Sequence, residues 1–510
     1  MSKCGKPAPF RHLIVTLSPL VCHIEAALFA HTLRSPIMKR HHNKTARITR
    51  LAGAAALVAG ALGVQAQSVD SLLDKLVDKG VLTTKEAQDM REQSDKDFTT
   101  AYAAKTGMPE WVTAFKINGD FRGRIEGFAA ADPAYQDYTR LRYRARIGFT
   151  AVMQNNLEAG LRLGSGDLDG YPANGADPIS NNQSLQNNGS KKGIFIDQAY
   201  LKWSGLNTPE ANGALTFGKM QNPMVFSSMA FDHDYTPEGG VAQANFNLSD
   251  KHTLSAASGY FVLDEVGSSS ANDAFMVNSQ LSLNSVWSPK LSTLVTGGFF
   301  WLGNPDSLAN GSVPNISVGN SRHGTTGLLD YEFNPFIIGA SGTYSLASFP
   351  LYPGAFPITV GGEYLLNPGA PNNDTINGVY TSTGNYAYNT GITFGKAGKK
   401  GTWEVAYQWR FMGANSWYEE LPESDFGAYL AVAQPNYLAV VQPNSGQGAG
   451  YRSGTNAKGH ILKASYSPWD MLTFTVAWYY TQVANEQLIS GTRTWDSHMN
   501  RIQVDAVLKF

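Results

Sequence analysis

The feature that most restricts the fold is a two-residue alternation of apolar and polar side chains, which recurs from Phe115 to Phe510. From Arg140 to Arg146 every second residue is arginine, and the residues between and after them to Phe149 are mostly apolar. Segments 115–125, 402–411 and 473–480 alternate in the same way. Successive side chains of a strand point to opposite faces, so each segment predicts a strand with one apolar and one mostly polar face.

No apolar run in the chain is long enough for a membrane-spanning helix. The longest, Leu51 to Val64, has 14 residues, whereas a spanning helix needs about 20. The chain is therefore either soluble or crosses a membrane as a closed β-barrel. A barrel is the only other solution, because every backbone N–H and C=O group must find a partner inside the bilayer.

A soluble β-sandwich also alternates, but three features favour the barrel. The predicted strands have about ten residues or more, as tilted membrane strands do. Large aromatic residues lie on the apolar face near strand ends, as in the girdles of membrane barrels: Trp301, Trp403, Trp409, Trp478 and Tyr480. Short connections (154–156, 288–290, 395–401, 467–470) alternate with long ones (165–192, 303–322, 367–384, 413–454).

We therefore predict an all-β fold, a transmembrane antiparallel β-barrel of about 16 strands over residues 111–510. Within 325–366, counting strands inward from the two ends of the chain assigns opposite strand directions. One strand is therefore missing or superfluous in that region. The barrel must close, since an open edge in lipid leaves backbone groups unpaired.

Residues 38–66 have the pattern of a signal peptide. Basic residues precede the apolar run, and small residues follow it, so cleavage is expected after Ala66. Residues 1–37 precede this signal and are interpreted as an extension from a mis-assigned start codon. Residues 67–110 are expected to be a periplasmic helical segment with two short helices within 69–97. This segment is interpreted either as an oligomerisation or tethering element or as a merely solvated hairpin.

The charge balance changes when residues 1–66 are removed. Of the 40 Lys+Arg and 41 Asp+Glu residues, 31 and 40 remain, which is a net charge of −9. A generic nucleic-acid binder would be basic, so nucleic acid is not an expected partner. Cys4 and Cys22 both precede the cleavage site, so the expected mature chain has no disulfide and no thiol metal site.

Six arginines are the candidate pore-lining residues, because they share the polar faces of two consecutive strands: Arg122, Arg124, Arg140, Arg142, Arg144 and Arg146. One arginine facing lipid near the bilayer midplane costs roughly 2–4 kcal/mol, so this face must be the lumen. Adjacent antiparallel strands would place the arginines side by side.

Two interpretations of these arginines stay open. A basic ladder on a pore wall raises the local anion concentration and filters solutes by charge. Alternatively, the arginines pair with an inward-folded acidic loop and brace the barrel. The candidate loop carboxylates are Asp167 and Asp169, or Asp232, Asp234 and Glu238.

No catalytic residues, metal site or cofactor are predicted. Asp232, His233 and Asp234 are consecutive, so they cannot all face one metal ion without distortion. Glu363 and Glu404 are expected to be lumen carboxylates without a partner for acid–base chemistry. The glycine-rich loops lack the spacing of nucleotide sites.

Several stretches in a fixed order resemble the putative porin family of Gram-negative bacteria. They are LLDKLVDKGVLTTKEAQ (72–88), IDQAYLKW (196–203), LTFGKMQNP (215–223), FDHDYTPEG (231–239), GEYLLNP (362–368), GKAGKKGTWEVAYQWR (395–410), SDFG (424–427), KGHILKASYSPWDML (458–472) and the terminal RIQVDAVLKF. The resemblance covers most of the expected mature chain. It implies a single barrel with a solute-permeable lumen in the outer membrane, with no catalytic signature.

The resemblance also implies the partners. These are outer-membrane lipid and lipopolysaccharide, small hydrophilic solutes, and the barrel-assembly machinery, which would read the terminal strand ending in Phe510. A homotrimer follows only by analogy with related porins. The expected function is passive diffusion of solutes and ions. The alternatives are a channel specific for an anion or a sugar, a barrel-anchored envelope tether, and an outer-membrane enzyme.

Overall fold

The computed structural model describes residues 107–133, 135–167, 176–267, 272–309, 312–315, 318–323, 326–376, 379–430, 450–489 and 496–510. The predicted extension (1–37), the predicted signal peptide (38–66) and the two predicted helices within 69–97 lie outside the described residues. The first strand begins at Val112, within the range predicted for the barrel.

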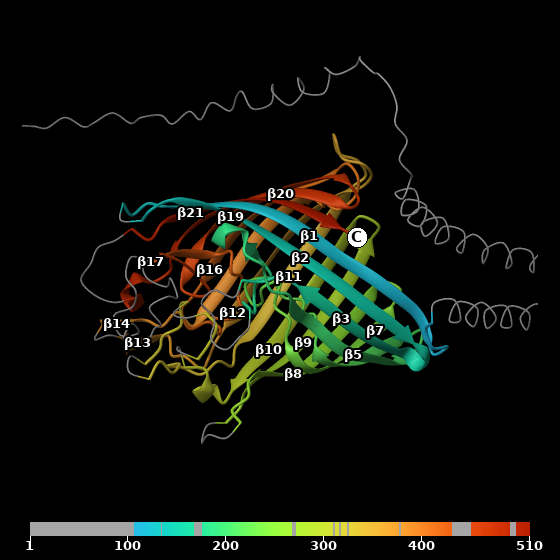
Figure 1. Ribbon diagram of the computed structural model, residues 1–510, viewed down its shortest axis with the longest axis horizontal. Coiled ribbons are helices and arrows are strands. Elements are labelled where there is room, and N and C mark those ends of the chain that lie inside the picture. Colours follow the sequence, from blue (N-terminus) through green and yellow to red (C-terminus); the bar gives the residue numbers. More distant parts are fainter. Residues whose placement is uncertain are drawn as a thin grey trace, which may run out of the picture. The chain divides into compact units, whose positions relative to one another are not determined.

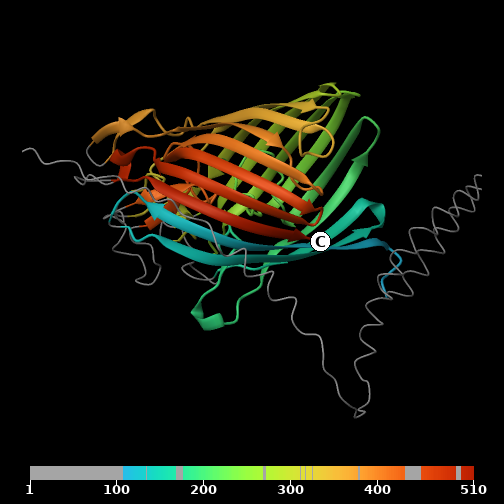
Figure 2. The ribbon, with the colours of Figure 1, turned by 90° about the horizontal axis from the view of Figure 1, so that it is seen from above.

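Sixteen strands among the described residues pair into one closed antiparallel barrel, and the short β4 joins the same sheet. Figures 1 and 2 show the barrel from two sides. They are β1 (Val112–Ala130), β2 (Tyr138–Met153), β3 (Leu157–Gly164), β5 (Phe195–Asn207), β6 (Ala211–Lys219), β7 (Glu238–Ser249), β8 (His252–Asp264), β9 (Ala274–Ser288), β10 (Leu291–Gly303), β11 (Phe336–Leu346), β12 (Phe356–Leu366), β15 (Tyr386–Gly395), β16 (Thr402–Met412), β19 (Ala457–Trp469), β20 (Leu472–Val483) and β21 (Met499–Lys509). Each strand pairs with the next, and β1 pairs with β21 from Asp120↔Lys509 to Ala130↔Met499. The predicted fold class and strand number are confirmed.

The connections differ between the two ends of the barrel. At one end they are short: 154–156, 208–210, 250–251, 289–290, 347–355, 396–401 and 470–471. At the other end most are longer: 131–137, 165–194, 220–237, 265–273, 304–335, 367–385, 413–456 and 484–498. These longer connections carry β4 (Gln183–Ser184), which pairs with β2, and two small hairpins, β13 (Asn373–Ile376) with β14 (Val379–Ser382) and β17 (Gly427–Leu430) with β18 (Gly450–Ser453).

The structure resolves the conflict in strand direction within 325–366. The connection from β10 to β11 extends to residue 335, beyond the predicted limit of 322, and β11 and β12 then form one hairpin around 347–355. The apolar residues of 328–335 pack inside the barrel: Phe333 is 1% exposed, and Leu329 packs against the buried cluster. Their hydrophobicity therefore reflects internal packing by a loop, and the segment is not an additional spanning strand.

The outward side chains of the barrel are apolar. Ile117 and Leu141 are about half exposed, whereas the inward Arg124 and Arg144 on the same strands are buried. Exposed aromatics lie outward near the strand ends with the longer connections, as Trp301 and Tyr480 do. At the other end, Trp403 packs on Phe356 and donates a hydrogen bond from its indole to the Leu351 carbonyl oxygen at 3.0 Å. The exterior therefore matches the apolar band and aromatic girdles of a membrane barrel.

Helical structure in the described residues is confined to short 3₁₀ turns: η2 (Gln154–Asn156), η3 (Asn187–Gly189), η4 (Pro305–Ser307) and η5 (Glu486–Ile489). In η2, Asn155 and Asn156 have φ of 59° and 60°, a left-handed conformation that asparagine tolerates better than most residues. Within the described part of the chain, no helix is long and apolar enough to cross a bilayer.

Candidate functional site

The six predicted arginines lie next to one another on the inner face of β1 and β2. The register places Arg122 opposite Arg144 and Arg124 opposite Arg142. Arg146 and Arg140 lie opposite carboxylates of β1, Asp120 and Glu126. The predicted juxtaposition is therefore present, and two carboxylates on β1 already lie within it.

Each of these arginines has an acidic partner. Arg144 and Arg146 both contact Asp120 (2.8 and 2.7 Å) and Asp234 (2.8 and 3.0 Å). The remaining pairs are Arg122 with Asp234 (3.9 Å), Arg124 with Asp505 (2.7 Å) and Asp425 (3.1 Å), Arg140 with Glu126, and Arg142 with Asp167 (3.2 Å) and Glu126 (3.6 Å). The ladder is thus a network of ion pairs and not a row of free cations.

The network continues onto strands that we did not predict to contribute. Arg501 on β21 is 2% exposed and contacts Glu126 (2.6 Å) and Asp425 (2.8 Å). On the other side, Arg162 of β3 pairs with Asp197 of β5. The alternation of RIQVDAVLKF already places Arg501 and Asp505 on the face opposite Ile502 and Val504. The polar face of the terminal strand therefore indicated from sequence that these two residues face the lumen. We call the inner face of β21, β1, β2 and β3 the arginine wall.

The connection 220–237, between β6 and β7, folds into the barrel and supplies Asp234 to the arginine wall. Of the loop carboxylates considered above, Asp167 and Asp234 do pair with the arginines. Asp169 lies outside the described residues. Glu238 pairs instead with Lys219 at 2.9 Å and is mostly exposed. Asp232 accepts hydrogen bonds from the backbone N–H groups of Asp234 and Ser424 (2.8 and 2.9 Å).

The two neighbouring carboxyls of this loop have opposite pKa shifts. Burial alone would raise the pKa of Asp234, but Arg144, Arg122 and Arg146 outweigh burial and hold the pKa below its ordinary value. Burial and the charge of Asp234 raise the pKa of Asp232 well above its ordinary value. Asp234 is therefore the carboxylate that anchors the loop to the wall.

A second connection, 413–426, also folds inward. Arg410 of β16 contacts Glu423 at 2.9 Å, and Ser228 of the first loop donates a hydrogen bond to the same carboxylate at 2.7 Å. Burial opposes ionisation of Glu423, but Lys463 and Arg410 outweigh it and lower the pKa to about 2. Asp425 reaches the arginine wall through Arg124 and Arg501.

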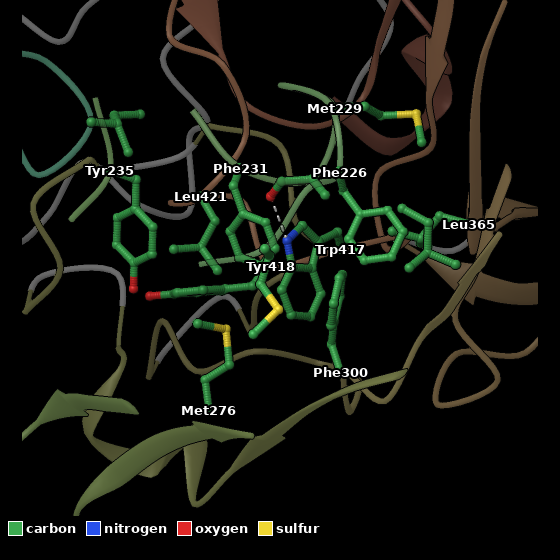
Figure 3. Packing of buried hydrophobic residues seen from close by; sticks show 14 of the residues in the cluster. Phe226, Met229, Phe231, Tyr235, Met276, Phe300, Leu365, Trp417, Tyr418 and Leu421 are labelled. Atoms are coloured by element: carbon green, nitrogen blue, oxygen red, sulfur yellow. Dashed lines mark hydrogen bonds between the residues drawn. The ribbon is translucent and has the colours of Figure 1, made fainter. Parts of the chain in front are cut away.

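The two inward loops share a hydrophobic cluster with the barrel wall. Figure 3 shows Trp417 of the second loop among Phe231 of the first loop and Phe300 of β10, and all three are at most 3% exposed. The Trp417 indole donates a hydrogen bond to the Ala230 carbonyl oxygen at 2.9 Å. Backbone bonds join Asp232 N to Leu421 O (2.7 Å) and Glu423 N to Ser228 O (3.0 Å). The loops therefore form one packed unit inside the barrel.

A cavity of about 360 Å³ remains between the first loop and the inner face of β10, β11, β12, β15, β16 and β19, which we call the cavity wall. In its middle the inward side chains are small or absent: Ser341, Gly361 and Gly391 are successive cross-strand partners. Glu363, predicted as a lumen carboxylate, lies on this wall and accepts hydrogen bonds from the Ser227 backbone N–H (2.8 Å) and hydroxyl. Glu404 lies on β16, on the face opposite the exposed Val405 and Tyr407.

Part of the chain matches a known protein family. Residues 130–304 match the model of a family described as putative porin. The matched segment is about a third of the chain and includes β2 to β10. The comparison with curated proteins finds no match.

Similar solved structures are outer-membrane barrels and porins. They include OprB of Pseudomonas putida, with 10% identity over 80% of this chain and 97% of that chain and a TM-score of 0.45. OmpF of Salmonella typhi, in complex with daunomycin, has 11% identity over 78% and 97% and a TM-score of 0.41. A mutant of the porin of Rh. blastica has 10% identity over 78% and 100% and a TM-score of 0.38.

Proposed function

We propose that this protein is an outer-membrane porin that lets small hydrophilic solutes and ions diffuse passively through its lumen. The observation that carries the proposal is a closed 16-strand barrel with an apolar exterior and a polar inner face. In bilayers, strands cross only as closed barrels, and a barrel of this size is wide enough for a channel. The match of residues 130–304 to a porin family supports the same conclusion.

Single-channel recording tests this proposal. The full-length protein, refolded and inserted into a planar bilayer, is expected to give steady ohmic conductance steps. A correctly folded barrel without conductance would contradict the porin function and favour a barrel that serves as an anchor or an enzyme. We propose no catalysis, because the carboxylates of the arginine wall and Glu363 and Glu423 at the cavity are engaged in ion pairs and hydrogen bonds.

The six arginines are proposed to line the lumen and to hold the two inward loops in place. Their side chains lie on the inner face, and Asp234 and Asp425 of the loops contact them directly. This role combines the two interpretations drawn from the sequence. The pore would prefer anions only through positive charge of the arginines that the carboxylates do not neutralise.

The route to the membrane is proposed from the sequence pattern. Export would use residues 38–66 with cleavage after Ala66, and the assembly machinery would bind β21 with its terminal Phe510. Lipopolysaccharide and lipid would cover the apolar exterior, and three copies would assemble as in related porins. Mass spectrometry of the protein from outer membranes would show a mature chain beginning at Gln67; a chain beginning upstream would contradict the cleavage site.

A solute-specific channel is the second candidate, and the packed loops favour it. The loops 220–237 and 413–426 occupy part of the lumen and leave a cavity of small-molecule size. A general diffusion pore would pass glucose and a sugar acid of equal size at rates that differ only by charge, whereas a specific channel would bind one of them.

A further inference from the structure

The cavity wall carries a cation whose surroundings differ from those of every residue in the arginine ladder. Lys463 of β19 faces inward, and its cross-strand partners are Ala406 on β16 and Ala477 on β20. Its side chain is 35% exposed. Its ion-pair contact among the described residues is Glu423 Oε1 at 3.7 Å, which is beyond hydrogen-bonding distance.

The carboxylate that Lys463 faces is already engaged. Glu423 Oε2 accepts from Arg410 (2.9 Å) and from the Ser228 hydroxyl (2.7 Å). Arg410 and Lys463 therefore both face Glu423 at this point of the cavity, and Glu404 of the neighbouring strand β16 adds a carboxylate that interacts with Lys463 without a direct ion-pair contact. Since Arg410 is only 2% exposed, Lys463 is the member of the pair that an incoming solute reaches.

Glu363, the acidic residue among those that line the cavity, is also engaged. Glu363 Oε1 accepts from the Ser227 backbone N–H, and Glu363 Oε2 accepts from the Ser227 hydroxyl and the Asn389 amide. A carboxylate whose two oxygens are both hydrogen-bonded offers little to a solute cation.

Further hydrogen-bond donors line the same cavity. Gln408 uses its amide oxygen to accept from Arg410 at 3.1 Å, which orients its NH₂ group away from that guanidinium. The hydroxyls of Ser341 and Thr393 and the imidazole of His233 also line the cavity. The groups of the cavity that remain able to bind a solute are thus one ammonium, one amide donor and several hydroxyls.

We propose that this cavity is a binding subsite for small hydroxycarboxylate anions. Lys463 binds the carboxylate, and Gln408 and Thr393, on the next two strands β16 and β15, bind hydroxyl groups. A charge-assisted hydrogen bond from an ammonium to a carboxylate is stronger than a neutral one, so Lys463 provides most of the discrimination against neutral sugars. The volume of about 360 Å³ suits one small solute. This inference rests on the proposed channel function and names its solute class.

The test uses gluconate as the anion and glucose as the neutral control of equal size. In bilayers of the full-length protein, gluconate is expected to reduce the single-channel chloride current in a saturable way, and glucose is not. Lys463→Gln should weaken the apparent gluconate affinity about tenfold, the loss expected for one charge-assisted contact. Lys463→Arg should restore most of it.

Lys458→Gln is the matched control. Lys458 lies on the same strand with its side chain on the opposite face, and it donates a hydrogen bond to the Ala484 carbonyl oxygen at the rim. This variant should bind gluconate as the wild type does. Equal block by gluconate and glucose, or equal behaviour of Lys463→Gln and Lys458→Gln, would overturn the subsite.

Calorimetric titration of gluconate into the folded protein in detergent separates this inference from the channel function. Conductance without gluconate binding would leave the porin intact and overturn the subsite. Gluconate binding that depends on Lys463, in a barrel that does not conduct, would overturn the porin and retain the anion subsite. Absence of both conductance and binding would overturn both proposals.

Discussion

The arginine wall and the cavity wall are two inner faces of the same barrel, and they use charge in opposite ways. On the arginine wall, cross-strand neighbours of the arginines include carboxylates, such as Asp120 opposite Arg146 and Asp505 opposite Arg124. On the cavity wall, Lys463 lies between two alanines. The many cations of the arginine wall are thus neutralised by neighbouring carboxylates. The cavity wall has few cations, and one of them, Lys463, stays accessible to solutes.

This difference has a structural consequence. The long side chains of the arginine wall reach the carboxylates of the inward loops and hold them. The cavity of about 360 Å³ lies against the other wall, where glycine, serine and threonine leave space. Many like charges on one strand therefore do not show where a solute meets a free charge in the lumen. The residues opposite them on the neighbouring strands determine whether a charge stays accessible.

The largest expected effect is on stability, from breaking the arginine wall at its most buried cation. Arg501→Met removes a cation that is 2% exposed and contacts both Glu126 and Asp425. Removing one partner of a buried ion pair costs about 3–5 kcal/mol. Because Glu126 keeps Arg140 and Arg142 and Asp425 keeps Arg124, we expect a loss in the free energy of unfolding near the lower end of that range. Urea unfolding in liposomes, followed by tryptophan fluorescence, measures it.

The control for this variant is Lys509→Met, on the same strand at an exposed position. It should change the free energy of unfolding by less than about 0.5 kcal/mol, as surface substitutions usually do. If Arg501→Met is as stable as Lys509→Met, the ion pairs of the wall do not hold the barrel interior together.

The next effect is on conductance, from loosening the loops that separate the two walls. Trp417→Ala removes the fully buried ring that packs on Phe231 and Phe300. A buried Trp→Ala substitution costs about 3–5 kcal/mol, and here the cost falls on the loop unit. We expect larger and noisier single-channel currents.

Trp469→Ala is the control, since Trp469 is 54% exposed at the end with short turns. Its currents should match those of the wild type. Unchanged currents in Trp417→Ala would show that the loops do not restrict the passage.

The smallest effect is a resistance to acid. Ionised Glu423 has a pKa lowered from its ordinary value of 4.5 to about 2. Its contribution to loop anchoring is therefore complete above its unfolded pKa and is lost only as the pH falls through the folded pKa. Conductance should be the same at pH 7 and pH 5 and should change only below about pH 4. A change between pH 7 and pH 5 that Glu423→Gln abolishes would contradict this.

The sequence was sufficient to predict the barrel, because each spanning strand repeats the same local alternation. The same pattern placed the six arginines on one face, and the cost of arginine in lipid turned that face inward. It also places Arg501 and Asp505 on the polar face of β21. We did not name them as candidates, because the prediction used only the apolar face of this strand.

The inward loops could not be predicted in the same way, because their contacts join segments far apart in the chain. Glu423 pairs with Arg410 and Ser228, and Asp425 with Arg124, and no local pattern encodes such pairs. A partial signal existed. Phe231 and Trp417 are large apolar residues in segments that connect strands, and such residues are seldom left in water.

The most direct test of the contrast between the two walls compares Lys463→Gln with Arg140→Gln. The two side chains are 35% and 36% exposed, and each substitution removes one positive charge. Arg140 donates a hydrogen bond directly to Glu126, whereas the Lys463 ammonium lies 3.7 Å from Glu423, beyond hydrogen-bonding distance. In a salt gradient across a planar bilayer, we expect Lys463→Gln to move the reversal potential clearly towards cation preference and Arg140→Gln to move it much less. If Arg140→Gln shifts the reversal potential as much as Lys463→Gln does, the contrast between the two walls is wrong. The arginine wall would then contribute to the ion preference as much as the cavity wall.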